Sequence, residues 1–421
     1  MKVAFIVQRY GSDILGGAEY MCRLVAERLA ERHHVEVLTT CARDYVSWKN
    51  EYAEGADRVR GVTVRRFANA QTRDIDAFNR RSDWIFNHPH SRSDELEWLR
   101  QQGPWCPALV EHLERHHRTF DALIFFTYLY APTVMGIQVA PTRSILVPTA
   151  HDEPAIRLGI YKEGFSSAAG IAYNTAVERR FVASHFSIRA VAEETVGCGV
   201  ELPPPAHGHG GHQDAIDADD EEPQAEGESP SSFGGRGAAF RRRHKLHGPM
   251  ALYGGRIEKG KGCEELVEYF RTYHAEGGEA QLALMGVKLM PLPEDPYIRF
   301  AGLLSERERM QALEAATVVI VPSPYESLSL LALEAFAVGT PILANARSEV
   351  LVDHCVRSNA GLYYADRDEF VECLTLLVAD PGLRVAMGGN GRAYVKEHYR
   401  WDLVITKIER MVAKVRGNTS G

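Results

Sequence analysis

Two glutamates, Glu326 and Glu334, lie eight positions apart in the segment PSPYESLSLLALEAFAVGTP, residues 322–341. The leucines and alanines after the apolar run TVVIVPS predict a buried helix that begins near Ser327 or Leu328. The free N–H groups at the start of such a helix form an anion site. A carboxylate among buried apolar side chains needs hydrogen-bond donors or a cation. The hydroxyl pairs of a sugar or a ribose would supply donors, whereas the plain alternative is an N-cap glutamate and a glutamate that reaches solvent.

A glycine-rich basic segment, GGRIEKGKG, joins a strand to a helix at residues 254–262. Its glycines allow a ligand to approach the backbone, and Arg256, Lys259 and Lys261 place positive charge at the carboxyl end of the strand. A diphosphate fits this chemistry, and a solvated basic loop is the alternative. The glycine spacing matches neither the dinucleotide-binding fingerprint nor the P-loop.

Two features of the N-terminal half are placed to face the same ligand. Gly16 and Gly17 stand where the first strand turns into the first amphipathic helix, so a ligand could lie against the backbone there. His151 follows a buried strand directly and could act as a hydrogen-bond donor or a proton relay. An ordinary turn and a structural histidine are the alternatives for these two features.

The elements that would position these residues alternate along the chain between apolar strands and helical periods. Strands that are apolar on both faces and separated by helices indicate parallel sheets covered on both sides. The predicted strands of the first series are 3–7, 34–40, 62–67, 122–127, 144–149 and 171–175. Those of the second series are 250–256, 280–286, 297–303, 317–323 and 341–346. The sequence therefore predicts an α/β protein with two doubly wound sheets that face a cleft, where such sheets bind ligands.

The predicted domains are 1–201 and 246–389. Residues 202–245 combine proline, glycine, an acidic run and a basic end with few large apolar side chains, which is typical of a disordered insertion or linker. A capping box at Ser305 predicts a helix to about residue 316. A C-terminal helix is expected over 390–421, packing back toward the N-terminal domain.

Composition excludes several classes of protein. The chain has 421 residues and a formal charge of −8, which argues against a nucleic-acid binder. Its seven cysteines show no zinc spacing and indicate reduced thiols in a cytoplasmic protein. The uncharged stretch 122–140 contains Pro132 and Gly136, which favour a strand, a turn and a short helix over a membrane span. Peripheral contact with a membrane stays open, although no strongly basic amphipathic helix argues for it.

Taken together, these motifs resemble those of the retaining glycosyltransferases of family 4, also called group 1, which have the GT-B architecture of two Rossmann-like domains. The motifs that carry the resemblance span nearly the whole chain: Gly16-Gly17-Ala18-Glu19, His151-Asp152, Gly197-Cys198-Gly199-Val200, Gly255-Arg256, Lys261-Gly262, Pro322-Ser323, Glu326, Glu334-Ala335 and Gly339-Thr340-Pro341.

The resemblance implies a role for each candidate residue. Arg256 and Lys261 would bind the donor diphosphate and stabilise the leaving phosphate in place of a divalent metal, which agrees with the charge argument. Glu326 would contact the hydroxyls of the donor sugar, and Glu334 would hold the ribose diol. The remaining contacts would come from backbone N–H groups near Leu328 and Ser329, from His151 near the sugar and acceptor, and from Gly16 and Gly17 at the donor-acceptor junction.

Three departures from the family pattern are visible. Ser329 stands where many relatives have glycine, and ANARSEV at 344–350 replaces a glycine-rich turn, which leaves a donor contact by Glu349 open. The insertion at 202–245 is also atypical. None of these removes a charged group that is expected to act.

The resemblance thus implies a retaining, metal-independent hexosyltransferase that uses a nucleotide diphosphate sugar and needs no cofactor. Its acceptor, whether a glycan, lipid, peptide or small molecule, would bind mainly to the N-terminal domain, and no nucleic acid is expected as a partner. Two alternatives are a nucleotide-sugar epimerase on the same architecture and a non-catalytic scaffold that binds sugar nucleotides. The base, the sugar and the stereochemical route are left undetermined.

Overall fold

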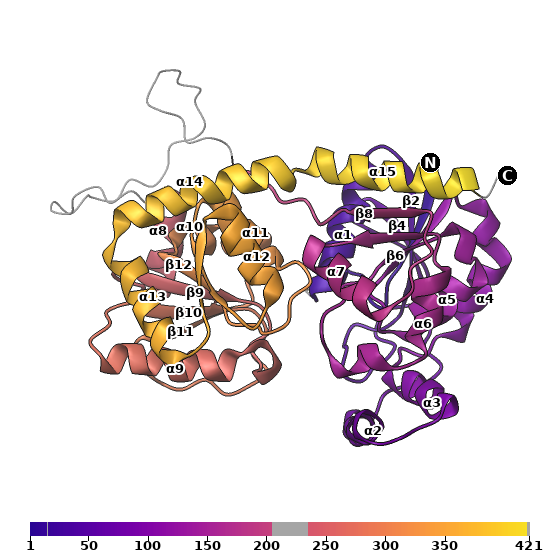
Figure 1. Cartoon of the computed structure of the whole chain (residues 1–421), viewed down its shortest axis with the longest axis horizontal. Helices are drawn as coiled ribbons and strands as arrows, with labels where there is room; N and C mark the ends of the chain where they lie inside the picture. The colour runs from indigo at the N-terminus through magenta and orange to yellow at the C-terminus, as the bar shows by residue number, and fades with distance from the viewer. Residues whose placement is uncertain (15, 204–234, 419–421) are drawn as a thin grey trace.

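The computed structural model describes residues 1–14, 16–203 and 235–418 (Figure 1). They form two α/β domains that lie side by side, with the two C-terminal helices running along both of them. The two parallel-sheet domains confirm the predicted fold class.

The N-terminal domain is built on an eight-stranded sheet of order β3-β4-β2-β1-β5-β6-β7-β8. All pairings are parallel except that of β3 with β4. The strands are β1 (Lys2–Ile6), β2 (His34–Thr40), β3 (Gly55–Val59), β4 (Val62–Phe67), β5 (Ala122–Phe126), β6 (Ser144–Val147), β7 (Gly170–Tyr173) and β8 (Ala192–Thr195). The sequence analysis missed β3 and β8, because each edge strand consists mainly of polar or small residues without an apolar run.

Helices cover both faces of this sheet. They are α1 (Gly17–Ala30), α2 (Ile75–Asn87), α3 (Arg92–Gln102), α4 (Pro107–His116), α5 (Ala131–Val139), α6 (Tyr161–Ser167) and α7 (Ala176–His185), with 3-10 turns η1 (His117–Thr119), η2 (Pro141–Arg143) and η3 (Pro154–Arg157). The uncharged stretch 122–140 forms β5 and α5, as predicted. No helix in the described part of the chain is both long and apolar enough to cross a membrane.

The C-terminal domain has a six-stranded, fully parallel sheet of order β11-β10-β9-β12-β13-β14. Its strands are β9 (Met250–Gly254), β10 (Gln281–Met285), β11 (Ile298–Gly302), β12 (Val318–Val321), β13 (Ile342–Asn345) and β14 (Gly361–Tyr364). Its helical elements are α8 (Gly235–His244), η4 (Lys259–Lys261), α9 (Cys263–Ala275), α10 (Glu306–Ala315), α11 (Leu330–Val338), α12 (Glu349–Ser358) and α13 (Arg367–Ala379). Helix α10 begins with the predicted capping box, in which Ser305 and Glu308 bond to each other's backbone N–H.

The last residues of the segment 202–245, which was expected to be a disordered insertion or linker, are helical instead. They form α8, which packs on α10 through the buried ring of Phe240, and the Arg241 guanidinium donates to the carbonyl of Ala315. The sequence analysis did not predict α8, because its polar run FRRRH shows no apolar periodicity and the helix is stabilised by tertiary packing. Residues 204–234, which carry most of that prediction, lie outside the described residues.

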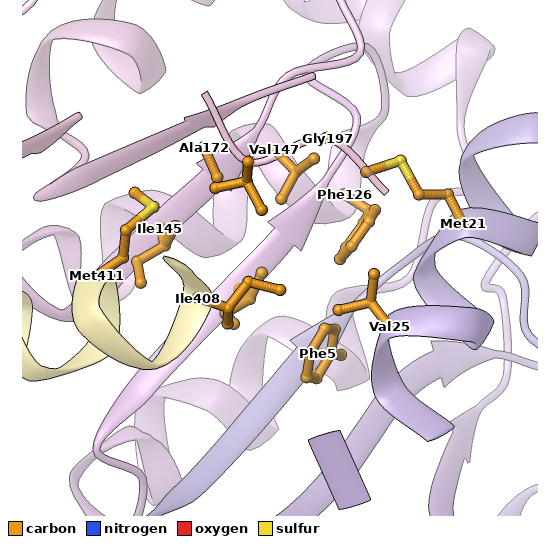
Figure 2. A pocket seen from close by; sticks show the side chains of 12 residues that line it. Phe5, Met21, Val25, Phe126, Ile145, Val147, Ala172, Gly197, Ile408 and Met411 are labelled. Atoms are coloured by element: carbon orange, nitrogen blue, oxygen red, sulfur yellow. The ribbon is translucent and has the colours of Figure 1, made fainter. Parts of the chain in front are cut away.

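The C-terminal end also differs in its boundaries. The helix expected from residue 390 begins earlier as α14 (Pro381–His398), packs against α11, and is followed after a short break by α15 (Trp401–Asn418). Helix α15 crosses to the N-terminal sheet, where Ile408 and Met411 face side chains of β1 and β6 (Figure 2). A small apolar cavity of about 20 Å³ remains between them.

Candidate functional site

Two adjoining cavities lie where the carboxyl ends of the strands of the two sheets approach each other. The smaller cavity, of about 260 Å³, is lined mainly by the C-terminal domain, and the larger, of about 620 Å³, is lined by both domains. At least one of them is lined by each of nine residues predicted from the sequence: Gly16, Gly17, His151, Arg256, Lys261, Glu326, Leu328, Ser329 and Glu334. Lys259 lines neither cavity and instead pairs with Glu264 on the surface. The fold therefore brings together residues that are more than 300 positions apart.

The helix after the glutamate loop starts later than the sequence predicted. Helix α11 begins at Leu330, and Ser329 caps it in the left-handed conformation with a φ of 63°. A left-handed backbone favours glycine, which accounts for the glycine that the family pattern has at this position; Ser329 adopts the same conformation at some cost in strain. Buried His354 bonds through Nε2 to the carbonyl of Leu328 at 2.8 Å. Burial lowers the pKa of His354 to about 4, so the neutral ring donates to this carbonyl and holds the loop.

The basic segment packs directly on the glutamate loop. Lys261 Nζ lies 3.0 Å from Glu326 Oε1, in an ion pair that is partly open to solvent. Gly262 closes the turn with a φ of 74°, and a Cβ there would lie 2.3 Å from the carbonyl oxygen of Pro322. Only glycine therefore lets the turn and the loop approach so closely.

Arg256 is held from both domains. Its guanidinium pairs with Glu258 at 3.2 Å and lies 5.2 Å from the centre of the Tyr45 ring, which belongs to the N-terminal domain. Nearby carboxylates, Glu258 first among them, raise the pKa of Arg256 against the opposing effect of burial. A permanent positive charge thus borders both cavities.

Glu334 is a buried carboxylate, as its apolar neighbours predicted, with a side chain that is 8% exposed. Its Oε1 accepts a hydrogen bond from Arg309 Nη2 at 2.7 Å, while its Oε2 is buried and has no hydrogen-bond partner among the described residues. Burial raises the pKa of Glu334, and the Arg309 charge opposes that shift. The sequence analysis missed Arg309, because it stands in a polar helix where nothing distinguishes it from neighbouring charges.

On the N-terminal side, His151 stacks on Tyr325 of the C-terminal domain, with ring centres 5.7 Å apart. Its Nε2 lies 3.7 Å from Glu153, which also accepts a hydrogen bond from the Tyr128 hydroxyl at 2.6 Å. Gly17, at the start of α1, has open space where a Cβ would be. The histidine and the glycine therefore both border the larger cavity, as expected of residues near a bound ligand.

Further contacts between the domains were not foreseen. Asn174 Nδ2 donates to Ser327 Oγ at 3.2 Å, and the Thr175 hydroxyl donates to the Ser327 carbonyl at 3.3 Å. Glu178 organises this region, since its carboxyl oxygens accept from the backbone N–H of Ala150 at 2.6 Å and of Asn174 at 2.5 Å. Burial raises the pKa of Glu178 to about 8. A buried carboxyl group thus joins the His151 loop to the contact with the glutamate loop.

Glu349, whose donor contact was left open, begins α12 on the surface and is not among the residues that line either cavity. No group of three or more His, Cys, Asp or Glu side chains within the described residues is arranged to hold a metal ion.

Comparisons with known proteins found similarity to glycosyl transferases. Residues 248–380 match the family model described as "Glycosyl transferases group 1". The GDP-mannose-dependent monoacylated alpha-(1-6)-phosphatidylinositol monomannoside mannosyltransferase of Corynebacterium glutamicum is 26% identical over 180 residues, which are 39% of this chain and 47% of that protein. The MMP alpha-(1->4)-mannosyltransferase of Mycolicibacterium hassiacum is 36% identical over 121 residues, or 27% and 29% of the two chains. The chain thus spans less than half the length of these relatives.

Solved structures match over almost the whole chain. Sucrose-phosphate synthase from Thermosynechococcus elongatus has a TM-score of 0.66 and 18% identity, with 99% of both chains covered. Anabaena HepE in complex with UDP and glucose has a TM-score of 0.66 and 14% identity, with 98% of this chain and 99% of that chain covered. This likeness confirms the GT-B fold, and the family match confirms the resemblance to group 1 glycosyl transferases.

Proposed function

We propose that this chain, whose residues 248–380 match the group 1 glycosyl transferases, transfers a sugar from a nucleotide diphosphate sugar to an acceptor bound at the N-terminal side of the larger cavity. The observation that carries the proposal is that the four charged residues predicted from the sequence all line the smaller cavity: Arg256, Lys261, Glu326 and Glu334. Removing a charged group from water is costly, and that cost is offset only where the group is paired or contacts a ligand. The named donors of relatives and neighbours, GDP-mannose and UDP-glucose, support a nucleotide sugar.

In this proposal the cationic side chains bind the diphosphate of the donor, and the carboxylates bind its sugar and ribose hydroxyls. Arg256 and Lys261 contact the diphosphate and stabilise the negative charge that develops as its bond to the anomeric carbon breaks. Glu326, 3.0 Å from Lys261, accepts hydrogen bonds from sugar hydroxyls, and the unpartnered Oε2 of Glu334 accepts from the ribose diol. Backbone N–H groups of Leu328 and Ser329 meet the sugar or phosphate.

The acceptor hydroxyl would approach from the N-terminal wall of the larger cavity, where His151 and Gly17 lie. Its oxygen forms the new bond to the anomeric carbon and loses its proton, and the nucleoside diphosphate departs. We further propose that the anomeric configuration is retained and that two cationic side chains serve the leaving group without a divalent metal. NMR analysis of the anomeric centre in the product tests the first of these, and activity in EDTA tests the second.

A thermal-shift panel tests donor binding. UDP-, GDP-, ADP- and TDP-sugars are added to the wild type and to Arg256→Ala, with and without EDTA, since a ligand that binds the folded state raises the Tm. One nucleotide series should stabilise the wild type independently of EDTA, and Arg256→Ala should lose the effect. Arg367→Ala, which changes an exposed arginine on α13, is the matched control and should keep it.

Turnover needs a separate assay. Release of nucleoside diphosphate in the presence of candidate acceptors should be seen with the wild type and be lost in Glu326→Ala. Unchanged turnover in that variant would refute the site assignment. A product formed from the donor without any acceptor would instead identify an epimerase, and binding without any product would identify a scaffold.

A further inference from the structure

Arg309 of α10 joins the two domains at the edge of the smaller cavity. Its Nη2 donates to Glu334 Oε1 at 2.7 Å and to the Tyr20 hydroxyl at 2.5 Å. The guanidinium also lies 4.8 Å from the centre of the Tyr20 ring. Tyr20 belongs to α1 in the N-terminal domain, and all three side chains line the smaller cavity. We name this set the Arg309 bridge: Tyr20, Arg309 and Glu334.

The carboxylate in the bridge is only half satisfied. Oε1 of Glu334 is hydrogen-bonded to Arg309, but within the described part of the chain Oε2 is buried without a hydrogen-bond partner. A buried, unpaired acceptor in a native site calls for an explanation, and a ligand that supplies donors is one. Because the side chain borders a cavity of about 260 Å³, there is room for that ligand.

Arg309 is also the cation that balances this carboxylate. Burial raises the pKa of Glu334, Glu306 on α10 raises it further, and Arg309 lowers it. Without the arginine, the pKa of the Glu334 carboxyl group would rise further, because burial would act with less opposition. The electrostatic balance at Glu334 therefore depends on the position of the Arg309 side chain.

Tyr20 fixes that position from the opposite domain. Burial raises the pKa of Tyr20 to about 12, so its hydroxyl is protonated and its oxygen accepts from Arg309. A second contact of α1 with α10 accompanies it, since Arg23 donates to Glu306 at 2.8 Å. The ordering of Arg309 is thus coupled to the contact between the domains, because an arginine side chain loses rotamer freedom when it is held.

We propose that Arg309 and Tyr20 are positioning residues for the donor nucleotide: Arg309 holds Oε1 of Glu334 and leaves Oε2 free for a ribose diol, and Tyr20 holds Arg309 at the contact between the domains. This inference rests on the proposed function, because it assumes a nucleotide donor in the smaller cavity. Its consequence is that the N-terminal domain contributes to donor affinity through Glu334.

The test compares two ligands that differ only in the ribose diol. The dissociation constants of UDP or GDP, whichever stabilises the wild type, and of its 2′,3′-dideoxy analogue are measured by calorimetry. Arg309→Met should weaken binding of the ribonucleotide by ~10-fold or more, since hydrogen bonds involving charged groups contribute that much. It should leave the dideoxy analogue unchanged, and Arg309→Lys should recover part of the loss.

Two further variants sharpen the result. Tyr20→Phe keeps the ring and removes the hydroxyl, so it should weaken the ribonucleotide by ~2-fold to 10-fold and spare the dideoxy analogue. Arg307→Met, on the exposed side of the same helix, should change neither constant. Circular dichroism and Tm establish that each variant is folded, and Tyr20→Phe carries the test if Arg309→Met does not fold.

The possible outcomes separate this inference from the proposed function. Equal weakening of both ligands would show a purely structural role for Arg309 and overturn the inference, as would unchanged binding of both. In either case the wild type still binds the nucleotide, and the proposed function stands. If the wild type bound no nucleoside diphosphate, the proposed function would fail, and the inference with it.

Discussion

Gly286 packs against the turn that carries Arg256, and replacing Gly286 by alanine should displace that turn. Gly286 follows β10 with a φ of 127°, and a Cβ there would lie 1.9 Å from the carbonyl oxygen of Gly255. Its N–H donates to the Gly302 carbonyl at 2.8 Å, so the backbone cannot swing away freely. The turn before Arg256 must therefore move in Gly286→Ala.

The expected destabilisation follows from two contributions. A non-glycine residue in such a backbone conformation costs ~1–3 kcal/mol. Displacing a packed backbone group adds ~1–3 kcal/mol. The unfolding free energy should fall by ~2–6 kcal/mol, which is a large part of the ~5–15 kcal/mol typical of native proteins.

Two other glycines separate these contributions. Gly302 has a φ of 80° but open space for a Cβ, so Gly302→Ala should cost only the backbone strain of ~1–2 kcal/mol. Gly260 has open space and no positive φ, so Gly260→Ala should change stability by less than ~0.5 kcal/mol. The three substitutions add the same methyl group in different surroundings.

Urea unfolding followed by tryptophan fluorescence measures the three free energies, and calorimetry measures the affinity for a nucleoside diphosphate. Gly286→Ala should show both the greatest loss of stability and a loss of affinity, because Arg256 is displaced. If Gly286→Ala were no less stable than Gly302→Ala and bound the nucleotide normally, the turn would not be held as described, and the reasoning would be refuted.

Three further predictions concern other parts of the molecule. Burial raises the pKa of Glu178 from 4.5 to about 8, so between these pH values the folded state holds a proton that the unfolded state releases. The unfolding free energy should therefore fall as the pH rises from 4.5 to 8, by at most ~1.4 kcal/mol per pH unit. Urea unfolding of Glu178→Gln should show a flatter pH dependence, and an equally steep one would contradict the assignment. Ser329→Gly relieves a left-handed φ and should raise the unfolding free energy by ~0.5–1 kcal/mol, whereas a fall in the same urea measurement would show that the serine side chain is needed. Ile408→Ala enlarges the cavity under α15 and should lower the unfolding free energy measured in urea by ~2–5 kcal/mol. The control Leu403→Ala, at an exposed position, should lower it by less than ~1 kcal/mol, and equal losses would show that α15 is not anchored there.

The fold was predictable wherever a local pattern carried its own signal. The runs VAFIV and TVVIVPS are apolar on both faces, and that property alone indicates buried parallel strands. Edge strand β8 carries the polar sequence AEET and gives no such signal. Helix α8 was missed for a related reason, since its Phe240 is buried by tertiary packing, in which α8 contacts α10.

The boundary of α11 shows where a correct motif still misplaces an element. The apolar run after Glu326 predicted a helix from Ser327 or Leu328, and the structure begins it at Leu330. The left-handed Ser329 and the hydrogen bond from His354 to the Leu328 carbonyl hold the loop outside the helix. Such a stop depends on a partner 26 residues away, so the local sequence could not reveal it.

The sequence by itself determined which chemical groups stand at the ends of the strands: Arg256, Lys261, Glu326 and His151 all follow apolar runs. Because parallel strands bring their carboxyl ends to one edge of a sheet, that pattern placed the first three at one edge of the C-terminal sheet and His151 at the corresponding edge of the N-terminal sheet. Only the tertiary structure decided which partners they meet. Arg309 reaches Glu334 across 25 residues and Tyr20 across 289, and contacts of that kind depend on how packed helices and whole domains dock, which no local pattern records.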